Sequence, residues 1–414
     1  MKRLYLNLSL FSVWLLLTGC LGIQSPTSLL QPPVIPGENA ELTSEINKHI
    51  PSQSDLLIPI NHTSVEPIIF TDLNGDGEDE AIFFYKPKEI PDHPIGVILK
   101  KRDHWEKIAE IEGSGNYLFD LQFADLNGDG KMEIIAGFGY SEQTEQYGLL
   151  VYDIFSDATP ELLFNDSYSN FVVDSFYPHQ LKSLVIFQFK KAKNNTISLH
   201  HFENETLVQQ DEISLDQFIN GYEKVSSGLI APHMTGLMVN TAFGAHSGST
   251  MIFQIENNEL IPLLINSDDS FMTEYPVYSA DTNQDGILEY GILRPSYSET
   301  EKSYAETIYF IDYYQLDDEM NPHKVGSYYE NPKYNFSVRL PDEYENIQIE
   351  LSDDYSYMKM MDPQSKEVLF DIYVTMLEQD FDDRWQLLTK NKGLYYLTSK
   401  NNPTHSFKFS LMET

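Results

Sequence analysis

Short hydrophobic runs recur along most of the chain and are separated by polar or glycine-containing turns. The runs are rich in β-branched and aromatic residues, as in EAIFFY from Glu80 and EIIAGFGY from Glu133. Residues of this kind favour strands, and the short runs bounded by turn residues are typical of antiparallel sheets. We therefore predict a mainly β fold.

A nine-residue polar pattern occurs three times between such runs, as DLNGDGEDE (72–80), DLNGDGKME (125–133) and DTNQDGILE (281–289). Positions 1, 3 and 5 are Asp or Asn, position 6 is Gly and position 9 is Glu in every copy. A tight loop turns oxygens on alternate residues toward one point, and the Gly supplies the positive φ of the sharp turn. Hard oxygen ligands without His or Cys suit Ca²⁺ rather than Zn²⁺. The alternative is a plain Asx-rich turn, but the threefold repetition favours metal binding.

The residues around these loops exclude an EF-hand. That motif needs a helix on each side and a Glu at position 12. Here strand-like runs flank the loops, and position 12 is Phe83, Ala136 and Ile292. The loops are therefore predicted to close β-hairpins.

The spacing of the copies predicts a repeat architecture. They start at residues 72, 125 and 281, so the first interval is 53 residues and the second is 156, or three steps of 52. A period near 50 indicates a propeller or array. Two units without ligands are then expected in the gap, at Asn170–Phe189 and Ser226–Ala245. The second unit continues with the runs GLLVYDI and PELLF, and four short strands per period correspond to one propeller blade.

The full pattern is F-x-D-x-N-x-D-G-x-x-E, with Phe70 and Phe123 two residues before the first Asp and Ser279 there in the third copy. This pattern resembles the FG-GAP or VCBS-type repeat of integrin-α-like β-propellers, from about Asp55 to Ser327. The resemblance implies a five-bladed calcium-binding β-propeller, with one calcium ion in each of the three loops. In that family the ligands come from positions 1, 3, 5 and 9 and from the backbone carbonyl of position 7. Carried over, the implied ligands are Asp72, Asn74, Asp76, Glu78 (backbone) and Glu80; Asp125, Asn127, Asp129, Lys131 (backbone) and Glu133; Asp281, Asn283, Asp285, Ile287 (backbone) and Glu289. Two departures are the Glu at position 9, where Asp is common in the family, and the two units without ligands.

The N-terminal residues predict export and a lipid anchor. Two basic residues precede a mostly apolar stretch that is too short for a comfortable membrane span and is typical of a signal peptide, residues 1–19. LTGC (Leu17–Cys20) resembles the bacterial lipobox, and Cys20 is the one cysteine of the chain. We expect Cys20 to be lipidated and residues 20–53 to form a Pro-rich tether, with a short helix at ENAELTSEINKHI. The expected location is the extracytoplasmic face of the cell membrane.

The repeat region is expected to span residues 54–326 and to be followed by a small α+β domain, residues 327–414. Strands are predicted in this domain at YNFSVRL, NIQIEL and VLFDIYVTM. A helix is predicted at EQDFDDRWQLLTKN (378–391).

The charge of the chain restricts its partners. With 63 acidic and 27 basic residues, the formal net charge is −36. Nucleic acids and polyanionic wall polymers would be repelled as direct ligands. The expected partners are the membrane, through the lipid anchor, and an unknown protein or carbohydrate.

The sequence contains no H-E-x-x-H, G-x-S-x-G, P-loop or dinucleotide-binding motif. Two Gly- and Ser-rich connections, GFGYSEQTEQYG and AFGAHSGST, are candidate ligand loops, with Tyr140, His246 and Ser247 as candidate contacts.

The leading hypothesis is a non-enzymatic binding or scaffolding module. One alternative is an enzyme that cleaves a polysaccharide or peptide; a glycosidase would need two carboxylates about 5–10 Å apart. Another is an accessory subunit in envelope or sporulation signalling.

Overall fold

The computed structural model describes most of the chain from residue 37 to residue 412. The ranges that it does not describe are 1–36, 62–65, 142–145, 157–159, 177–180, 191–194, 216–218, 244–246, 265–271, 299, 301–302, 304–305, 378–381, 401–405 and 413–414. The predicted signal peptide, Cys20 and His246 therefore lie outside the described residues.

Helix α3 (Gly37–His49) forms where ENAELTSEINKHI predicted a helix. Leu42 and Ile46, four residues apart on one face, are buried against the first sheet. It is the one helix of the described residues, none of which form a helix with the length and apolar character needed to cross a membrane.

The described strands form six antiparallel sheets, so the fold is mainly β, as predicted. The strands of the first sheet are β1 (Asp55–Leu57), β2 (Ile68–Thr71), β3 (Glu80–Lys86), β4 (Ile95–Lys101) and β5 (Trp105–Glu112). Those of the second sheet are β6 (Tyr117–Ala124), β7 (Glu133–Gly139), β8 (Tyr147–Asp153) and β9 (Glu161–Tyr168). Successive strands pair as neighbours in both sheets, except that β1 and β2 pair with different ends of β3.

The third and fourth sheets occupy the gap between the second and third polar loops. The strands of the third sheet are β10 (Asn170–Asp174), β11 (Ser183–Gln188), β12 (Asn195–Glu203) and β13 (Thr206–Leu215). Those of the fourth sheet are β14 (Ile219–Ala231), β15 (Met234–Phe243), β16 (Ser247–Glu256), β17 (Glu259–Leu264) and β18 (Met272–Thr273). The prediction of strand, turn and strand in both ligand-free units is confirmed by β10–β11 and β14–β15.

The last two sheets are interleaved along the chain. The strands of the fifth sheet are β19 (Tyr290–Pro295), β20 (Tyr309–Leu316), β21 (Pro322–Asn331), β22 (Phe336–Leu340) and β28 (Lys408–Leu411). Those of the sixth sheet are β23 (Gln348–Leu351), β24 (Tyr357–Met361), β25 (Val368–Thr375), β26 (Trp385–Asn391) and β27 (Leu394–Ser399). Because β21 runs through the expected domain boundary at 326/327, the fifth sheet contains residues from both sides of it.

The prediction of a helix at residues 378–391 is wrong, because residues 385–391 form strand β26. Lys392 and Gly393 both have positive φ, 46° and 83°, as in a type I′ turn, and this turn pairs β26 with β27. Pairing with β27 outweighs the helical spacing of the apolar residues. The described part of 327–414 is therefore all β, and the expected α+β character is corrected.

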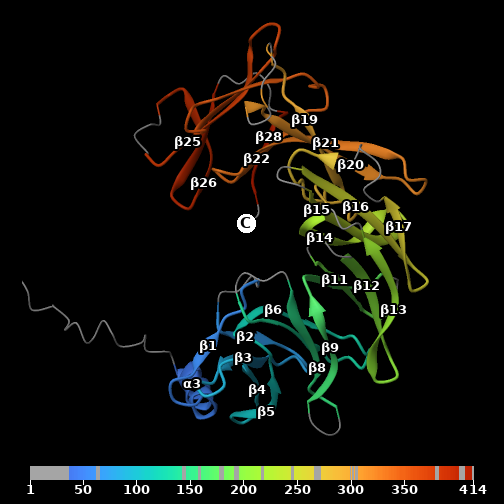
Figure 1. The fold of residues 1–414 in the computed structure, drawn as a ribbon. Helices are drawn as coiled ribbons and strands as arrows, with labels where there is room; N and C mark the ends of the chain where they lie inside the picture. The colour runs from blue at the N-terminus through green and yellow to red at the C-terminus, as the bar shows by residue number, and fades with distance from the viewer. Residues whose placement is uncertain are drawn as a thin grey trace, which may run out of the picture.

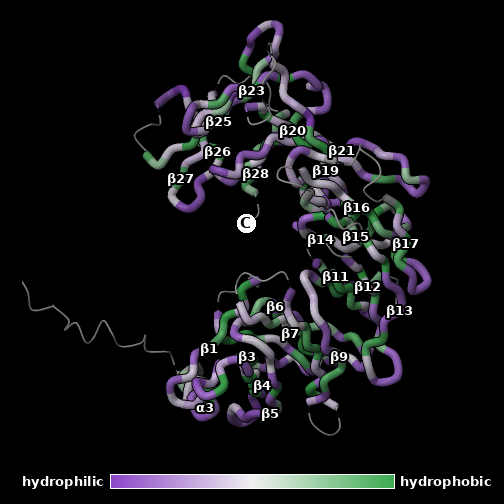
Figure 2. Tube along the Cα trace, viewed as in Figure 1, coloured by the Kyte–Doolittle hydropathy of each residue, from purple (hydrophilic) through white to green (hydrophobic). Residues whose placement is uncertain are grey.

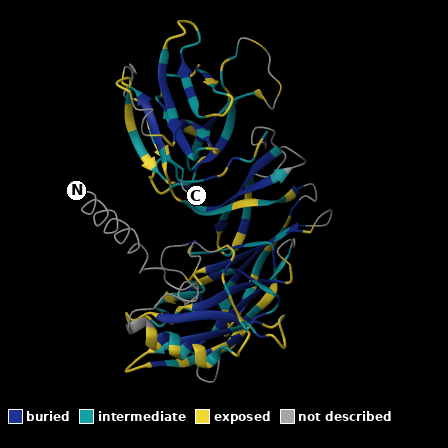
Figure 3. Ribbon diagram, turned by 90° about the vertical axis from the view of Figure 1, so that its left-hand side faces the viewer, coloured by how far each residue is buried: buried dark blue, intermediate teal, exposed yellow. Residues whose placement is uncertain are grey.

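Hydrophobic clusters fill the spaces between successive sheets. One cluster joins Ile82 and Phe84 of the first sheet to Ile134 and Phe138 of the second. Similar clusters join the second to the third sheet, the third to the fourth, and the fourth to the fifth. The central strands are buried on both faces, so they carry continuous apolar runs rather than alternating ones. Figure 2 shows the hydrophobic residues along the strands, and Figure 3 shows that exposed residues gather in the turns.

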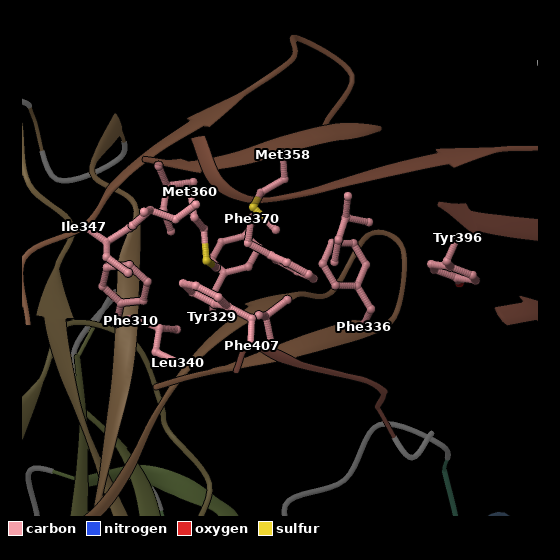
Figure 4. Close-up of a cluster of buried hydrophobic side chains, with 14 of the residues drawn as sticks. Phe310, Tyr329, Phe336, Leu340, Ile347, Met358, Met360, Phe370, Tyr396 and Phe407 are labelled. Carbon is pink, nitrogen blue, oxygen red and sulfur yellow. The ribbon is translucent and has the colours of Figure 1, made fainter. Parts of the chain in front are cut away.

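The sheets follow one another in chain order along an arc (Figure 1). The first sheet lies at one end of the arc, and the fifth and sixth sheets lie at the other. A closed ring of blades is not formed by the described residues. The fifth and sixth sheets share the core drawn in Figure 4, in which Phe310, Phe336 and Phe370 pack together with Met358 and Met360.

Candidate metal centre

Loop 1 (72–80), loop 2 (125–133) and loop 3 (281–289) share one backbone conformation. The position-6 glycines have φ of 86°, 85° and 90°, as the sequence predicted. Their N–H groups donate to the position-1 carboxylates of Asp72, Asp125 and Asp281, at 2.8, 3.1 and 2.9 Å. Each loop therefore winds around its first aspartate. Loops 1 and 2 join the first two strand pairs, β2–β3 and β6–β7, as predicted hairpins.

The position-5 carboxylates support the turn in the same way. Those of Asp76, Asp129 and Asp285 accept the N–H of position 7, at 3.1, 2.9 and 2.9 Å. These hydrogen bonds fix the backbone of position 7, which is the expected source of a carbonyl ligand. The residues at this position are Glu78, Lys131 and Ile287.

The position-9 glutamates are buried at the inner side of the loops. Glu80, Glu133 and Glu289 each accept the N–H of position 2 through Oε2, at 2.8, 2.6 and 2.6 Å. Burial, with the charges of Asp153 and Asp125, raises the pKa of Glu133 to about 7 against the opposing hydrogen bond from Leu126. A buried carboxylate is costly without a compensating cation. The three loops differ in the groups that contact the buried carboxylate of this glutamate.

Loop 3 brings its carboxylates together. Oxygens of Asp281, Asp285 and Glu289 lie within 4.8 Å of one another. Burial, with the charges of Asp281 and Asp285, raises the pKa of Glu289. Its Oε1 atom is buried and has no hydrogen-bond partner among the described residues. An oxygen-only donor set with an unpartnered buried oxygen fits a hard divalent cation such as Ca²⁺.

Loop 1 has an internal cation instead. Lys100 on β4 donates to Asp76 and lies with Nζ 3.1 Å from Oε1 of Glu80. The hydrogen bonds and charges of these two carboxylates raise the pKa of Lys100. An ion in loop 1 would have to compete with this ammonium group.

Loop 2 is intermediate between the other two. The Asn127 amide donates to Oε1 of Glu133 at 2.8 Å. Lys131 contacts Asp129 at 3.2 Å on the exposed side of the loop. In loop 1 the Asn74 amide makes the same contact with Oε1 of Glu80, so the difference between the two loops is the added ammonium group of Lys100.

The loops also connect neighbouring sheets. Met132 in loop 2 donates its N–H to the carbonyl of Leu73 in loop 1 at 2.7 Å. Leu288, at the same position of loop 3, donates to the carbonyl of Leu229 in β14 at 2.8 Å. The same hydrogen bond therefore joins the first sheet to the second and the fourth to the fifth.

The candidate ligand loops are only partly described. Tyr140 directly follows β7, is 63% exposed and has its hydroxyl 3.3 Å from that of Ser114. Ser247 is the first residue of β16 and is half-buried. These two residues belong to different sheets, and His246 lies outside the described residues.

A cavity of about 1490 Å³ between the fifth and sixth sheets was not anticipated. It is lined by tyrosines and carboxylates from segments far apart in the chain, including Tyr275, Tyr297 and Tyr355. No local motif marks these residues, because they come together only through the packing of the two sheets.

The fold and the loops define a β-sheet repeat protein with Asp-rich hairpin loops. Residues 72–136, which contain loops 1 and 2, match the family described as FG-GAP-like repeat. The predicted repeat type is therefore confirmed for this segment of the chain.

No protein with a curated description matches the chain. Among solved structures, the exotype rhamnogalacturonan lyase YesX is 12% identical with a TM-score of 0.28, over 77% of this chain and 72% of that one. The Bacillus licheniformis rhamnogalacturonan lyase PL11 is 10% identical with a TM-score of 0.31, over 77% and 71%. The WD40 domain of SCAP from fission yeast is 9% identical with a TM-score of 0.28, over 87% and 90%. At TM-scores this low, these similarities say nothing about the chemistry of this chain.

Proposed function

We propose that the protein is a lipid-anchored, extracytoplasmic binding or scaffolding module in which five repeat units form the calcium-stabilised blades of an open, propeller-like arc. The observation that carries the proposal is the set of three Asp-rich loops, each placed where one sheet meets the next. Such loops stabilise an architecture. The absence of a catalytic motif from the sequence agrees with a non-enzymatic role.

Calcium is the proposed cofactor because the three loops offer only oxygen ligands. Loop 3 fits best, since its carboxylates converge and Oε1 of Glu289 is unpartnered. Loops 1 and 2 carry the same residue types at the same positions. In this proposal the ions hold the strand pairs and their neighbours in register, which keeps the exposed turns in place for a ligand.

Membrane anchoring is proposed from Cys20 alone. It is the one cysteine of the chain and stands at the lipobox position. Cysteine lipidation at this point leaves the sheets outside the membrane on the Pro-rich tether.

Crosslinking in intact cells tests the binding role. The full lipidated chain is crosslinked and recovered, and its partners are compared with those of a variant carrying Asp281→Asn and Asp285→Asn. A macromolecule recovered with the native chain and lost or reduced with the variant supports the proposal. If purified protein instead releases reducing ends or peptides from cell-envelope material, the enzymatic alternative replaces it.

A further inference from the structure

The cavity between the fifth and sixth sheets has an aromatic lining. Five tyrosines contribute to it, Tyr275, Tyr297, Tyr309, Tyr329 and Tyr355. Tyr297 and Tyr355 are 42% and 49% exposed, so parts of their rings are open to a ligand. We call this hollow the tyrosine cavity.

Four of the five rings of the tyrosine cavity contact neighbouring groups. Tyr275 and Tyr309 form an edge-to-face pair with their centroids 6.2 Å apart. The ammonium group of Lys333 lies 5.5 Å from the ring centroid of Tyr355. Tyr329, which also lines the cavity, belongs to the core shared by the two sheets (Figure 4). The aromatic surface is therefore pre-organised, which lowers the entropic cost of binding a ligand.

Polar groups also line the tyrosine cavity. Lys366 donates to Oε1 of Gln348 at 3.0 Å, and Gln348 donates to Glu350 at 3.3 Å. Glu330 is half-buried, and its side chain accepts no hydrogen bond from the described residues. Burial raises the pKa of Glu330. A ligand that brings hydroxyl donors would supply the missing hydrogen bonds to this carboxyl group.

The size and charge of the tyrosine cavity narrow the ligand class. Its volume of about 1490 Å³ exceeds the range of roughly 300–1,000 Å³ that is usual for single small molecules. The lining includes four carboxylates, Glu306, Glu330, Glu350 and Asp353, against the two lysines Lys333 and Lys366. An extended ligand without negative charge fits both properties.

A saccharide fits better than a peptide strand. β23 is the edge strand of the sixth sheet and lines the cavity, so it is the place where a peptide could add as a further strand. The edge is already used beside β23, because Tyr297 donates its N–H to the carbonyl of Ile347 at 2.9 Å. Pyranose rings, in contrast, place their C–H faces on tyrosine rings and their hydroxyls on carboxylates and amides, and need no free strand edge.

We propose that the tyrosine cavity binds an uncharged oligosaccharide, with Tyr297 and Tyr355 stacking on its sugar rings. This inference rests on the proposed binding role and adds to it a site and a ligand class.

Calorimetric titration of the full chain in detergent tests the proposal. The probes are the hexasaccharides of cellulose, chitin, mannan and xylan, with oligogalacturonate as the anionic comparison. We expect binding of at least one uncharged probe and none of oligogalacturonate. Tyr297→Ala and Tyr355→Ala should each weaken binding by about tenfold, as expected for loss of an aromatic anchor.

Two further variants separate stacking from folding effects. Tyr297→Phe keeps the ring and should keep the affinity. Tyr278→Ala removes a tyrosine of similar exposure, 45%, that does not line the cavity, and should bind as the native chain does. Failure of all uncharged probes to bind, or binding that neither alanine variant weakens, overturns the proposal. Partners recovered by crosslinking in cells would still uphold the binding role, so the two failures are distinguishable.

Discussion

Three glutamates occupy the same position of the repeated pattern but have different partners. Oε1 of Glu80 contacts both the Asn74 amide and the Lys100 ammonium group, and Oε1 of Glu133 contacts the Asn127 amide. Oε1 of Glu289 has no hydrogen-bond partner among the described residues. The expected order of calcium affinity is therefore loop 3, then loop 2, then loop 1.

Glu289→Gln should remove one calcium site with little change in shape. The substitution replaces one carboxylate oxygen by an amide, which cannot ligate a hard cation through nitrogen. We expect equilibrium dialysis to show the loss of the tightest of the bound ions. Glu259→Gln in the hairpin between β16 and β17 is the control and should keep full stoichiometry. An unchanged tight site in Glu289→Gln would rule out loop 3 as the metal centre.

Lys100→Met should make loop 1 dependent on calcium. In the absence of metal, Glu80 would be left buried without a cation, which we expect to lower the free energy of unfolding by about 3 kcal/mol. With calcium present, the ion should replace the ammonium and restore most of that stability. Denaturant unfolding with and without chelator measures both values. The matched variant is Lys101→Met on the same strand, whose native side chain is exposed.

The sequence pattern could identify the ligands of each loop but not Lys100. Its position depends on the register of β3 with β4, in which Ala81 lies opposite Leu99. This register brings Lys100 beside Glu80, from 20 residues further along the chain. Residues that compensate a charge across strands are set by pairing, and a linear motif does not contain that information.

At the scale of elements, the strands were predictable, but one segment predicted as a helix is a strand in the structure. The apolar runs around the loops became β3 and β7 because both of their faces are covered by neighbouring sheets. The run WQLLTKN has apolar residues at helical spacing. The turn that follows it reverses the chain, so the run forms one strand of a hairpin. The signal that was missed is the Lys392–Gly393 dipeptide, with positive φ at both residues.

Gly393→Ala should therefore destabilise the sixth sheet. An alanine at a φ of 83° is strained, at a cost of about 1 kcal/mol. Lys392→Asn should be neutral or stabilising, since Asn tolerates the left-handed conformation. Denaturant midpoints of the two variants check the prediction. A more stable Gly393→Ala variant would be incompatible with this turn.

At the scale of the molecule, the repeat period predicted the sheets correctly but not their arrangement. The 52-residue step located the third and fourth sheets, which carry no ligands. The open arc depends on the angle between successive sheets and on the packing of the sixth sheet against the fifth, through residues such as Phe336 and Tyr396. Neither property is encoded in a local pattern.

Chelation should lower the melting temperature of the whole stack. Extracellular calcium sites often bind at about 10⁻⁴ M, and at 10 mM calcium one such site stabilises by about 2.7 kcal/mol. Even one site is then a large part of a typical free energy of unfolding, about 5–15 kcal/mol. Calorimetry with calcium, with magnesium and with chelator checks this, and magnesium should substitute poorly. A melting temperature that chelator leaves unchanged after all metal is removed would show that the loops are only turns.

Cys20→Ser should release the protein from the membrane. Lipidation needs the thiol, so the native chain should partition into detergent and the variant into the aqueous phase. Because Cys20 lies outside the described sheets, the Cys20→Ser variant should keep the calcium-dependent melting of the native chain. Partitioning of both proteins into detergent would indicate a retained transmembrane anchor.

The return of β28 to pair with β22 has a consequence for how the chain reaches its final form. The first four sheets use strands that are contiguous in sequence, so each can assemble as soon as its own residues are available. The fifth sheet cannot be completed in this order, because β22 must wait for β28, about seventy residues later. During folding, the edge of β22 therefore stays uncovered until β28 is available, and this interval is when the chain is most exposed to proteolysis and to pairing with other chains.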